Sequence, residues 1–359
     1  MESAIDKNLA CPRNRPRRMP DNYAPPFPGW VGRADGQVKH YVMAYLGVQA
    51  LKPQHQQALR AAHLELIQSL GLPHGPAHYD LTQFIDLEGF DNRLVIAYWS
   101  DLLEFERWKA AAQTSKWWKC SQRGADGLGY FREVLKPTVN RLETFYSTPD
   151  RLEGVGVVMG GCSEEIQEHG YWGSMRDRIP LAQTNALRAR GHLEVNGKGL
   201  KANVAGHQNL VVIRSGQDWS DTEALERSHY LNVMEPTLRQ GMDYLRDKGV
   251  PIGCYSNRYM KHIDADGREI EKSFSVSHWH SLCDLERWSK LHSTHVKIFG
   301  TFMQMAQTFK GDLKWRGYHE VSVLEADAQQ YEYINCHPRT GLLNGIKPEG
   351  RTTKKRYRR

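Results

Sequence analysis

His295 is the residue of this sequence whose surroundings most suggest chemistry. The apolar positions around it recur at helical spacing, in the order Trp288, Leu291, His295, Ile298 and Phe302, so the histidine falls in the middle of an apolar stripe. A buried imidazole must find a partner for each ring nitrogen. A carbonyl or carboxylate can satisfy one nitrogen, but the other needs an acceptor, a donor or a metal ion. His295 is therefore either a hydrogen-bonded core histidine or a ligand.

Four further polar positions are candidates for the same interior. His319 shares one face of a predicted strand with two valines, and Ser215 ends a strand on the face that carries a valine and an isoleucine. A satisfied core histidine and a turn serine are the structural alternatives. Arg176 and Arg178 lie two residues apart in GYWGSMRDRIP, so on a helix they diverge, and at most one faces a given pocket. A salt bridge with a nearby acid is the alternative for either arginine.

The histidines near the predicted helix could in principle form a zinc site or a haem site. These histidines are His278, His280, His292 and His295. The first two belong to a strand end and the others to adjacent helical turns, and no Asp or Cys completes a tetrahedral set. Haem suits a lone helical histidine better, because it needs one axial imidazole, a large apolar slot and an open opposite face. Ile298, Phe299 and Phe302 would supply the apolar walls.

Two internal echoes indicate how the chain positions these residues. WSDLLEFERW at 99–108 returns as WHSLCDLERW at 279–288, an offset of 180. GYFREV at 129–134 returns as GYHEV at 317–321, an offset near 188. Two echoes in the same order argue for a duplication, in which each copy is one supersecondary unit packed against the other. The two histidines at 295 and 319 occur in the second copy alone, as expected if one half is a scaffold and the other carries a site.

The same order of elements is predicted in each copy. The first copy has a strand over 38–48, a helix over 54–70, a strand over 94–99, a helix over 102–112, and strands near 131 and over 142–146. The second has a strand over 210–213, a helix over 222–246 interrupted at Pro236, strands over 254–263 and 270–279, one long helix over 282–309, and strands over 318–324 and 330–335. Strand, helix, two strands, helix, strand is the plan of a ferredoxin-like unit.

We therefore expect an α+β protein of two ferredoxin-like units packed sheet to sheet, of the dimeric α+β barrel type, with the haem held by the second unit. The expected divisions are an N-terminal extension (1–36), the first unit (37–151), a linking segment (152–206), the second unit (207–345) and a basic tail (346–359). No repeated low-complexity stretch and no glycine-rich phosphate loop interrupts this plan.

Composition excludes several classes of protein. The 359 residues, 40% hydrophobic and 25% charged, are typical of a globular chain, and no apolar run reaches the ~18 residues of a membrane helix. Six cysteines stand singly, without a Cys-x-x-Cys pair, which favours a reducing cytoplasm over a disulfide framework. The net charge of +7 lies in the arginine-rich ends, and the remainder sums to −3, so we expect no nucleic-acid partner and no membrane partner.

Several long blocks of the sequence resemble the haem-containing aldoxime dehydratases, most closely the phenylacetaldoxime and aliphatic aldoxime enzymes of bacteria. The blocks are HGYWGSMRDRIP from His169, NLVVIRSGQDWSDT from Asn209, GCYSNRY from Gly253, THVKIFG from Thr294, YHEVSV from Tyr318 and YEYINCHPRTG from Tyr331. The likeness extends from Met1 to about Leu343. The resemblance implies conversion of an aldoxime, R-CH=N-OH, to a nitrile and water on a ferrous haem b, in a homodimer of two-unit chains.

The resemblance also implies roles for particular residues. By motif, His295 would be the axial ligand of the haem iron, and His319 the distal acid and base. Ser215 would hold the oxime oxygen, Arg178 would be required for activity, and Glu143 would lie near the distal histidine. The chemistry suits these residue types, because hydroxide is a poor leaving group unless an acid protonates it, and the same imidazole can then remove the carbon-bound hydrogen.

Two alternatives remain open. One is an oxidising haem enzyme of the dye-decolourising peroxidase-like type, which would need ferric iron and peroxide. The other is a non-catalytic haem carrier or basic nucleic-acid-binding module, which would keep its function after replacement of Ser215 and His319.

Overall fold

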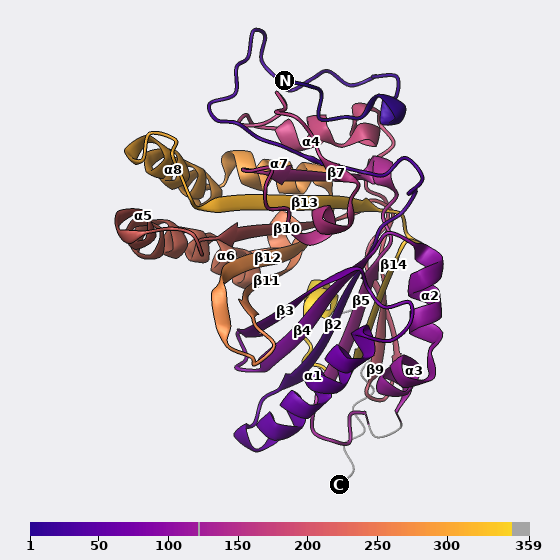
Figure 1. Ribbon diagram of the computed structural model, residues 1–359. Coiled ribbons are helices and arrows are strands. Elements are labelled where there is room, and N and C mark those ends of the chain that lie inside the picture. The colour runs from indigo at the N-terminus through magenta and orange to yellow at the C-terminus, as the bar shows by residue number, and fades with distance from the viewer. Residues whose placement is uncertain (121–122, 347–359) are drawn as a thin grey trace.

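The computed structural model describes residues 1–120 and 123–346 (Figure 1). Most of the predicted basic tail, from position 347 onward, lies outside the described residues. Within them, twelve strands form one sheet in the order β6-β13-β10-β12-β11-β3-β4-β2-β5-β14-β9-β8. A separate pair joins β1 (Gly32–Arg33) to β7 (Gly161–Cys162). Together with the helices that cover this sheet, the strands confirm the predicted α+β class.

The elements follow the chain in three groups. The first group is β2 (Val42–Ala50), α1 (Gln56–Leu70), β3 (His78–Ile85), β4 (Asp91–Trp99), α2 (Leu102–Ala110), α3 (Ala112–Lys119), β5 (Gly129–Leu135) and β6 (Leu142–Tyr146). After β7 come α4 (Ser174–Arg178), β8 (Glu194–Lys198) and β9 (Lys201–Ala205). The last group is β10 (Leu210–Asp218), α5 (Ala224–His229), a π-helical turn (Tyr230–Met234), α6 (Glu235–Lys248), β11 (Cys254–Ile263), β12 (Glu269–Trp279), α7 (Leu282–Leu291), α8 (Ser293–Thr308), β13 (Arg316–Leu324) and β14 (Gln329–Ile334).

The two halves of the chain exchange strands and share a core. β6 of the first group pairs with β13, and β14 of the last group pairs with β5. One buried cluster contains residues of both halves, among them Tyr45 and Ile96 from the first and Val276 and Phe274 from the second. Helices cover the outer faces, with α1, α2 and α3 on the first half and α6, α7 and α8 on the second (Figure 1). The halves are thus packed face to face and also joined at their edges through β11 and β3.

Two predicted elements were wrong in detail. The helix predicted over 282–309 is two helices, because His292 takes an extended conformation and its side chain accepts a hydrogen bond from the Thr294 amide, capping α8. Leu291, placed in the apolar stripe by the sequence, is consequently 70% exposed. Strand β3 was not located by the sequence pattern, because it turns the polar side chains of Asp80 and Thr82 into the core. The predicted interruption near Pro236 is confirmed as the π-helical turn that precedes it.

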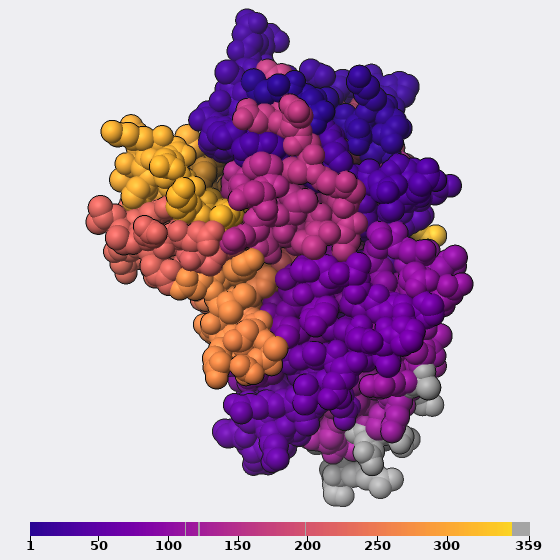
Figure 2. Space-filling view, viewed as in Figure 1, coloured from indigo at the N-terminus to yellow at the C-terminus, as the bar shows by residue number. Residues whose placement is uncertain are grey.

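The segment predicted to link the two halves is itself folded, and it forms hydrogen bonds with the N-terminal extension. Glu168 accepts a hydrogen bond from the Ala4 amide, and Asp177 accepts one from the Arg18 amide. The Tyr23 hydroxyl donates to the His169 carbonyl at 2.7 Å. In Figure 2 the indigo N-terminal segment lies directly against the magenta linking segment. The two segments together cover the end of the second half at which α4 lies (Figure 1).

Buried neutral histidines should make the stability of this fold depend on pH. Burial lowers the pKa of both His262 and His278 to about 4, whereas an unfolded histidine titrates near 6.5. The folded state therefore binds fewer protons between these values, so the free energy of unfolding should fall as pH drops below 6.5. At pH 5 each histidine should account for about 2 kcal/mol of that loss.

Urea unfolding measured between pH 5 and 6.5 tests this. His278→Gln should flatten the slope of the unfolding free energy against pH, while the same change at the exposed His192 should leave the slope unaltered. An identical slope in wild type and His278→Gln would contradict the assignment of His278 as a neutral buried group.

Candidate active site

Strand register places two of the sequence-predicted polar residues side by side. Ser215 on β10 pairs directly with His319 on β13, and His319 pairs on its other side with Phe145 on β6. Residues opposite each other on neighbouring strands project from the same face of a sheet. The valines at 211, 321 and 323 on this face pack with residues of α6 and α7. The hydroxyl, the imidazole and the phenyl ring therefore form one row facing the helices of the second half.

One ring nitrogen of His319 meets both an arginine and a carboxylate. Arg178 Nη2 lies 2.7 Å from His319 Nε2, and Glu143 Oε1 lies 3.0 Å from the same atom. A guanidinium can only donate, so the first contact uses Nε2 as an acceptor. Glu143 Oε1 is within ion-pair distance but has no hydrogen bond of its own. The two contacts therefore suit the two charge states of the imidazole. A neutral Nε2 can accept from Arg178, and a protonated Nε2 can donate to Glu143.

Arg178 and Glu143 are themselves deeply buried. Their side chains are 2% and 1% exposed, and Arg178 Nε donates to Glu143 Oε2 at 2.7 Å. Burial by itself would raise the pKa of Glu143, but the charges of Arg178 and His319 outweigh it, so the pKa lies below its ordinary value. Arg178 also donates to the Glu168 carbonyl at 2.7 Å and lies 5.3 Å from the centre of the Phe145 ring. Glu143 is consequently a fixed negative charge beside His319.

The two arginines of α4 diverge, as their spacing predicted. Arg176 points away from His319 and pairs with Glu286 on α7, its Nε donating to Oε1 at 2.8 Å. Only Arg178 reaches the row of His319 and Ser215. The short helix begins after Gly173, which has a φ of +98°, a conformation that favours glycine.

A buried ionic cluster lies on the opposite face of the same two strands. Arg214 and Glu320, the neighbours of Ser215 and His319 in sequence, pair in the register of β10 and β13. Arg214 Nη1 forms an ion pair with Asp80 Oδ2 at 2.7 Å, and the Tyr98 hydroxyl donates a hydrogen bond to Glu320 Oε1 at 2.9 Å. These contacts reach from the second half to β3 and β4 of the first. They hold β10 and β13 in place from the face of the sheet opposite Ser215 and His319.

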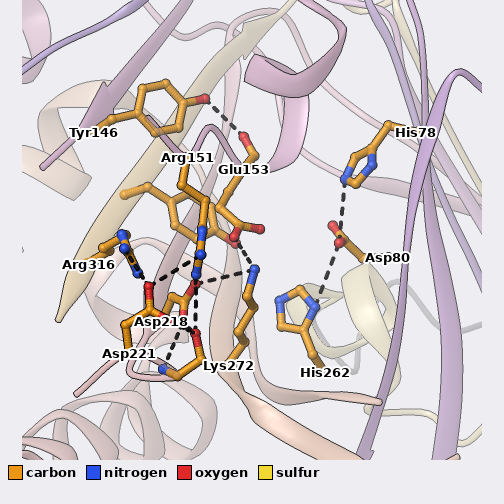
Figure 3. A network of polar contacts seen from close by, with 12 residues as sticks. His78, Asp80, Tyr146, Arg151, Glu153, Asp218, Asp221, His262, Lys272 and Arg316 are labelled. Carbon is orange, nitrogen blue, oxygen red and sulfur yellow. Dashed lines mark hydrogen bonds and ion pairs between the residues drawn. The ribbon is translucent and has the colours of Figure 1, made fainter. Parts of the chain in front are cut away.

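The ends of these strands are held by a second set of charges (Figure 3). Lys272 on β12 forms ion pairs with Glu153 and, at 3.4 Å, with Asp218 at the end of β10. Arg151 lies 3.1 Å from the same Asp218 carboxylate. In the same view Asp80 lies between His78 and His262, with its Oδ1 within 4 Å of a ring nitrogen of each. The segment that follows Ser215 is therefore tied to β12 and to the segment after β6.

His295 lies on α8 in an apolar setting that keeps its imidazole neutral. The rings of Trp288 and Trp172 lie 4.6 and 5.8 Å from it, both edge-on. Burial lowers the pKa of His295 to about 4, although contact with the Ser289 backbone opposes the effect. Its Nδ1 is buried without a well-formed hydrogen bond. A neutral imidazole with fixed orientation is the form that ligates a metal.

The residues around His295 fit a haem. Of the sixteen residues of α8, only Thr301 and Met305 are buried, so the side chains of Ile298, Phe299 and Phe302 are only partly covered by protein. Phe299 packs on Trp172 at 5.1 Å, and Phe302 packs on Trp315 at 5.4 Å. An axial imidazole with a partly open apolar surface around it is the environment that a porphyrin ring needs. The charges of the site lie instead on β6, β13 and α4.

Aromatic contacts connect α8 to the strand of His319. Phe302 packs on Phe27 at 5.5 Å, Phe27 on His169 at 5.2 Å, His169 on Phe145 at 5.3 Å, and Phe145 on His319 at 5.5 Å. The sequence did not identify Phe27, Phe145 or His169 as part of the site. Phe145 follows Glu143 by two positions on β6, so strand alternation could have found it. Phe27 and His169 come from irregular segments and carried no such signal.

The zinc alternative finds no support in the described part of the chain, where no group of three or more His, Cys, Asp or Glu side chains could hold a metal ion. None of the helices in residues 1–120 and 123–346 has the length and apolarity needed to cross a membrane.

Comparisons with known proteins find relatives over nearly the whole chain. A family model described as haem-containing dehydratase matches residues 44–342. The aliphatic aldoxime dehydratase of Rhodococcus globerulus is 50% identical over 96% of this chain and 98% of its own length. The phenylacetaldoxime dehydratase of Bacillus sp. (strain OxB-1) is 31% identical over 91% of this chain and 94% of its own. A crystal structure of an aldoxime dehydratase in complex with butyraldoxime superposes with a TM-score of 0.92, at 50% identity and 96% coverage of both chains.

Proposed function

Because this chain belongs to the haem-containing dehydratase family, we propose how its own residues dehydrate an aldoxime to a nitrile and water. The chain is a haem lyase that acts on aldoximes. Its relatives are dehydratases, so the alternative of an oxidising haem enzyme has no support. The observation that carries the proposed roles of individual residues is the meeting of Arg178, Glu143 and His319 around one ring nitrogen, next to Ser215.

His295 of the second unit would hold the iron of the haem, and the side chains of Ile298, Phe299 and Phe302 would lie against the porphyrin. In the ferrous state, the haem would supply an iron atom able to bind the oxime nitrogen and to donate electron density towards the N–O bond. Support comes from the neutral, aromatic-flanked imidazole and the partly covered apolar face of α8. Trp172 and Trp288 would keep the ring plane of His295 from rotating.

His319 is proposed to move the protons of the reaction. Protonated His319 gives a proton to the oxime hydroxyl, which leaves as water. The neutral ring then takes the hydrogen of the oxime carbon as a proton on Nε2, and the electron pair of the C–H bond completes the triple bond. The balance is R-CH=N-OH to R-C≡N and H₂O, with His319 returned to its starting state. A histidine changes charge near neutral pH, so one side chain can serve both steps.

The neighbours of His319 are proposed to stabilise both of its charge states. When the ring is neutral, Nε2 accepts from Arg178; when it is protonated, Nε2 donates to the free Oε1 of Glu143. Ser215, beside His319 in the strand row, would donate its hydroxyl hydrogen to the oxime oxygen and set the direction of the leaving group. Phe145, stacked on His319, would limit rotation of the imidazole and exclude water from that side.

At the level of architecture, we propose a duplication of two ferredoxin-like units, 37–151 and 207–345, with the segment 152–206 between them. Both halves have the order strand, helix, two strands, helix, strand. The echoed tryptophans support it, because Trp99 packs on Trp108 at 5.0 Å and Trp279 packs on Trp288 at 5.6 Å, each pair joining a strand end to the next helix. We also propose a cytoplasmic homodimer, consistent with six cysteines that form no disulfide.

The experiment that tests the function is nitrile formation from phenylacetaldoxime by the purified, haem-loaded protein. After reduction with dithionite under anaerobic conditions, we expect a shift of the haem absorption on adding the aldoxime, followed by phenylacetonitrile detected by chromatography. The unreduced protein should form little nitrile and is the matched control. Nitrile formation that is equal in both redox states would contradict the ferrous assignment, and no nitrile in either would contradict the function.

A further inference from the structure

A second concave site lies away from His295 and His319, at the other end of α7. It is a cleft of about 540 Å³, which we call the arginine cleft, lined among others by Arg15, Arg176, Arg188, Arg190, His280 and Cys283. The lining comes from four separate parts of the chain: the N-terminal extension, α4, the segment after α4, and the start of α7. Its volume lies in the range of small-molecule sites.

The charges of the arginine cleft are of one sign. Its lining holds four arginines and no carboxylate among the described residues. Arg176 is already neutralised, because it pairs with Glu286 at 2.5 Å. Arg15 donates to the amide oxygen of Asn185 at 2.9 Å, which leaves its charge uncompensated. Arg188 and Arg190 are exposed and form no ion pair with a described residue, in contrast to Arg13, which pairs with Asp177 at 3.6 Å.

The start of α7 adds to the positive field of the cleft. Ser281 and Cys283 line it, and they lie at the N-terminal end of a ten-residue helix, where the helix dipole is positive. The acid of this turn, Asp284, is not part of the lining, and its charge is shared between Arg287, which donates to it at 3.1 Å, and the lining residues Ser281 and His280. Three uncompensated guanidinium groups and a helix start thus converge on one concavity.

We propose that the arginine cleft binds a small polyvalent oxyanion, carrying phosphate or carboxylate groups. Guanidinium groups recognise both groups through paired N–H donors, and several arginines around one cavity favour an anion with more than one charge. The hydroxyls of Ser281 and Thr184 already donate to Asp284 and to the Leu181 carbonyl, so the arginines are the donors that the cleft offers to an anion. The concave shape and volume favour a small molecule over an extended polyanion.

Isothermal titration of the haem-loaded protein at constant ionic strength tests the proposal. Pyrophosphate is the phosphate probe, citrate the carboxylate probe, and sodium chloride the control for screening. We expect saturable binding of at least one probe with one site per chain, weakened at least tenfold in the double variant Arg188→Gln/Arg190→Gln. Lys52→Gln/Arg60→Gln is the matched control, since it removes the same charge from exposed positions on the first half and should bind as the wild type does.

Cys283 supplies an independent readout of location. It is the one cysteine of the six that is exposed, and it lines the cleft. The bound probe should slow its alkylation by the neutral reagent iodoacetamide several-fold, as measured by peptide mass spectrometry, and the double variant should lose this protection. Binding of pyrophosphate alone or of citrate alone identifies the group that the cleft prefers. Non-saturating heats with both probes, equal weakening in the control variant, or unprotected Cys283 would each overturn the proposal.

Discussion

Replacement of His319 by alanine is expected to abolish nearly all nitrile formation while leaving the haem in place. His319 lies on β13, and the proposed iron ligand lies on α8, so removing the distal imidazole leaves the axial bond untouched. Positioned proton transfer contributes about 10² to 10⁴ in rate, so kcat should fall by about that factor. Haem content per chain, measured by the pyridine haemochrome spectrum, should match that of the wild type.

Two further variants distinguish a role of His319 in proton transfer from a role in packing. His192→Ala, at an exposed histidine, is the matched control and should retain wild-type kcat. Glu143→Gln keeps the shape of the buried side chain but removes the charge that faces Nε2, so it should lower kcat and shift the pH profile of kcat towards lower pH. Unchanged turnover in His319→Ala would remove this residue from the mechanism, and an unshifted profile in Glu143→Gln would remove the electrostatic role of the carboxylate.

Replacement of His295 by alanine should give a protein that is purified without bound haem. The imidazole is the only axial donor proposed, and the remaining contacts around α8 are apolar, so they cannot hold the iron on their own. The Soret band should be lost or reduced at least tenfold. Val296→Ala is the matched control, because it changes an exposed neighbour on the same helix and should keep full haem content.

The variant could lose haem because it misfolds and not because it lacks the ligand. Adding free imidazole distinguishes these two causes. Free imidazole added with hemin should restore a Soret band in His295→Ala, because the deleted side chain leaves space where the small molecule can bind. The far-ultraviolet circular dichroism of the variant should match that of the haem-free wild type. A variant that retains all its haem without added imidazole would show that His295 is not the ligand.

Local patterns in the sequence were sufficient for part of the site. Period-two alternation placed His319 and Ser215 on the same face as the core valines of their strands, which the structure confirms, but Ser215 does not end its strand, because β10 continues to Asp218. The spacing of Arg176 and Arg178 predicted that the two would diverge, and they do. These features follow from the geometry of a single helix or strand, so a short window of sequence contains the information.

Other features depended on contacts between distant segments. The sequence predicted one helix across His292, but capping of α8 by that side chain breaks it, and this competition between local hydrogen bonds is not visible in apolar spacing. Strand β3 was missed because its inward side chains include Asp80, whose burial is compensated by partners on distant strands, chiefly Arg214 on β10.

By itself, therefore, the sequence determined the faces of individual elements, the α+β class and, through its long matching blocks, the chemistry to expect. The resemblance implied that Glu143 lies near His319, but only the tertiary structure brought Arg178 to the same nitrogen, because these residues come from β6, α4 and β13, which are far apart in the chain. The register of β10 and β13 is set by pairing along their whole length and by the ionic contacts behind them. Such pairing is a cooperative property of the folded chain, and no local pattern encodes it.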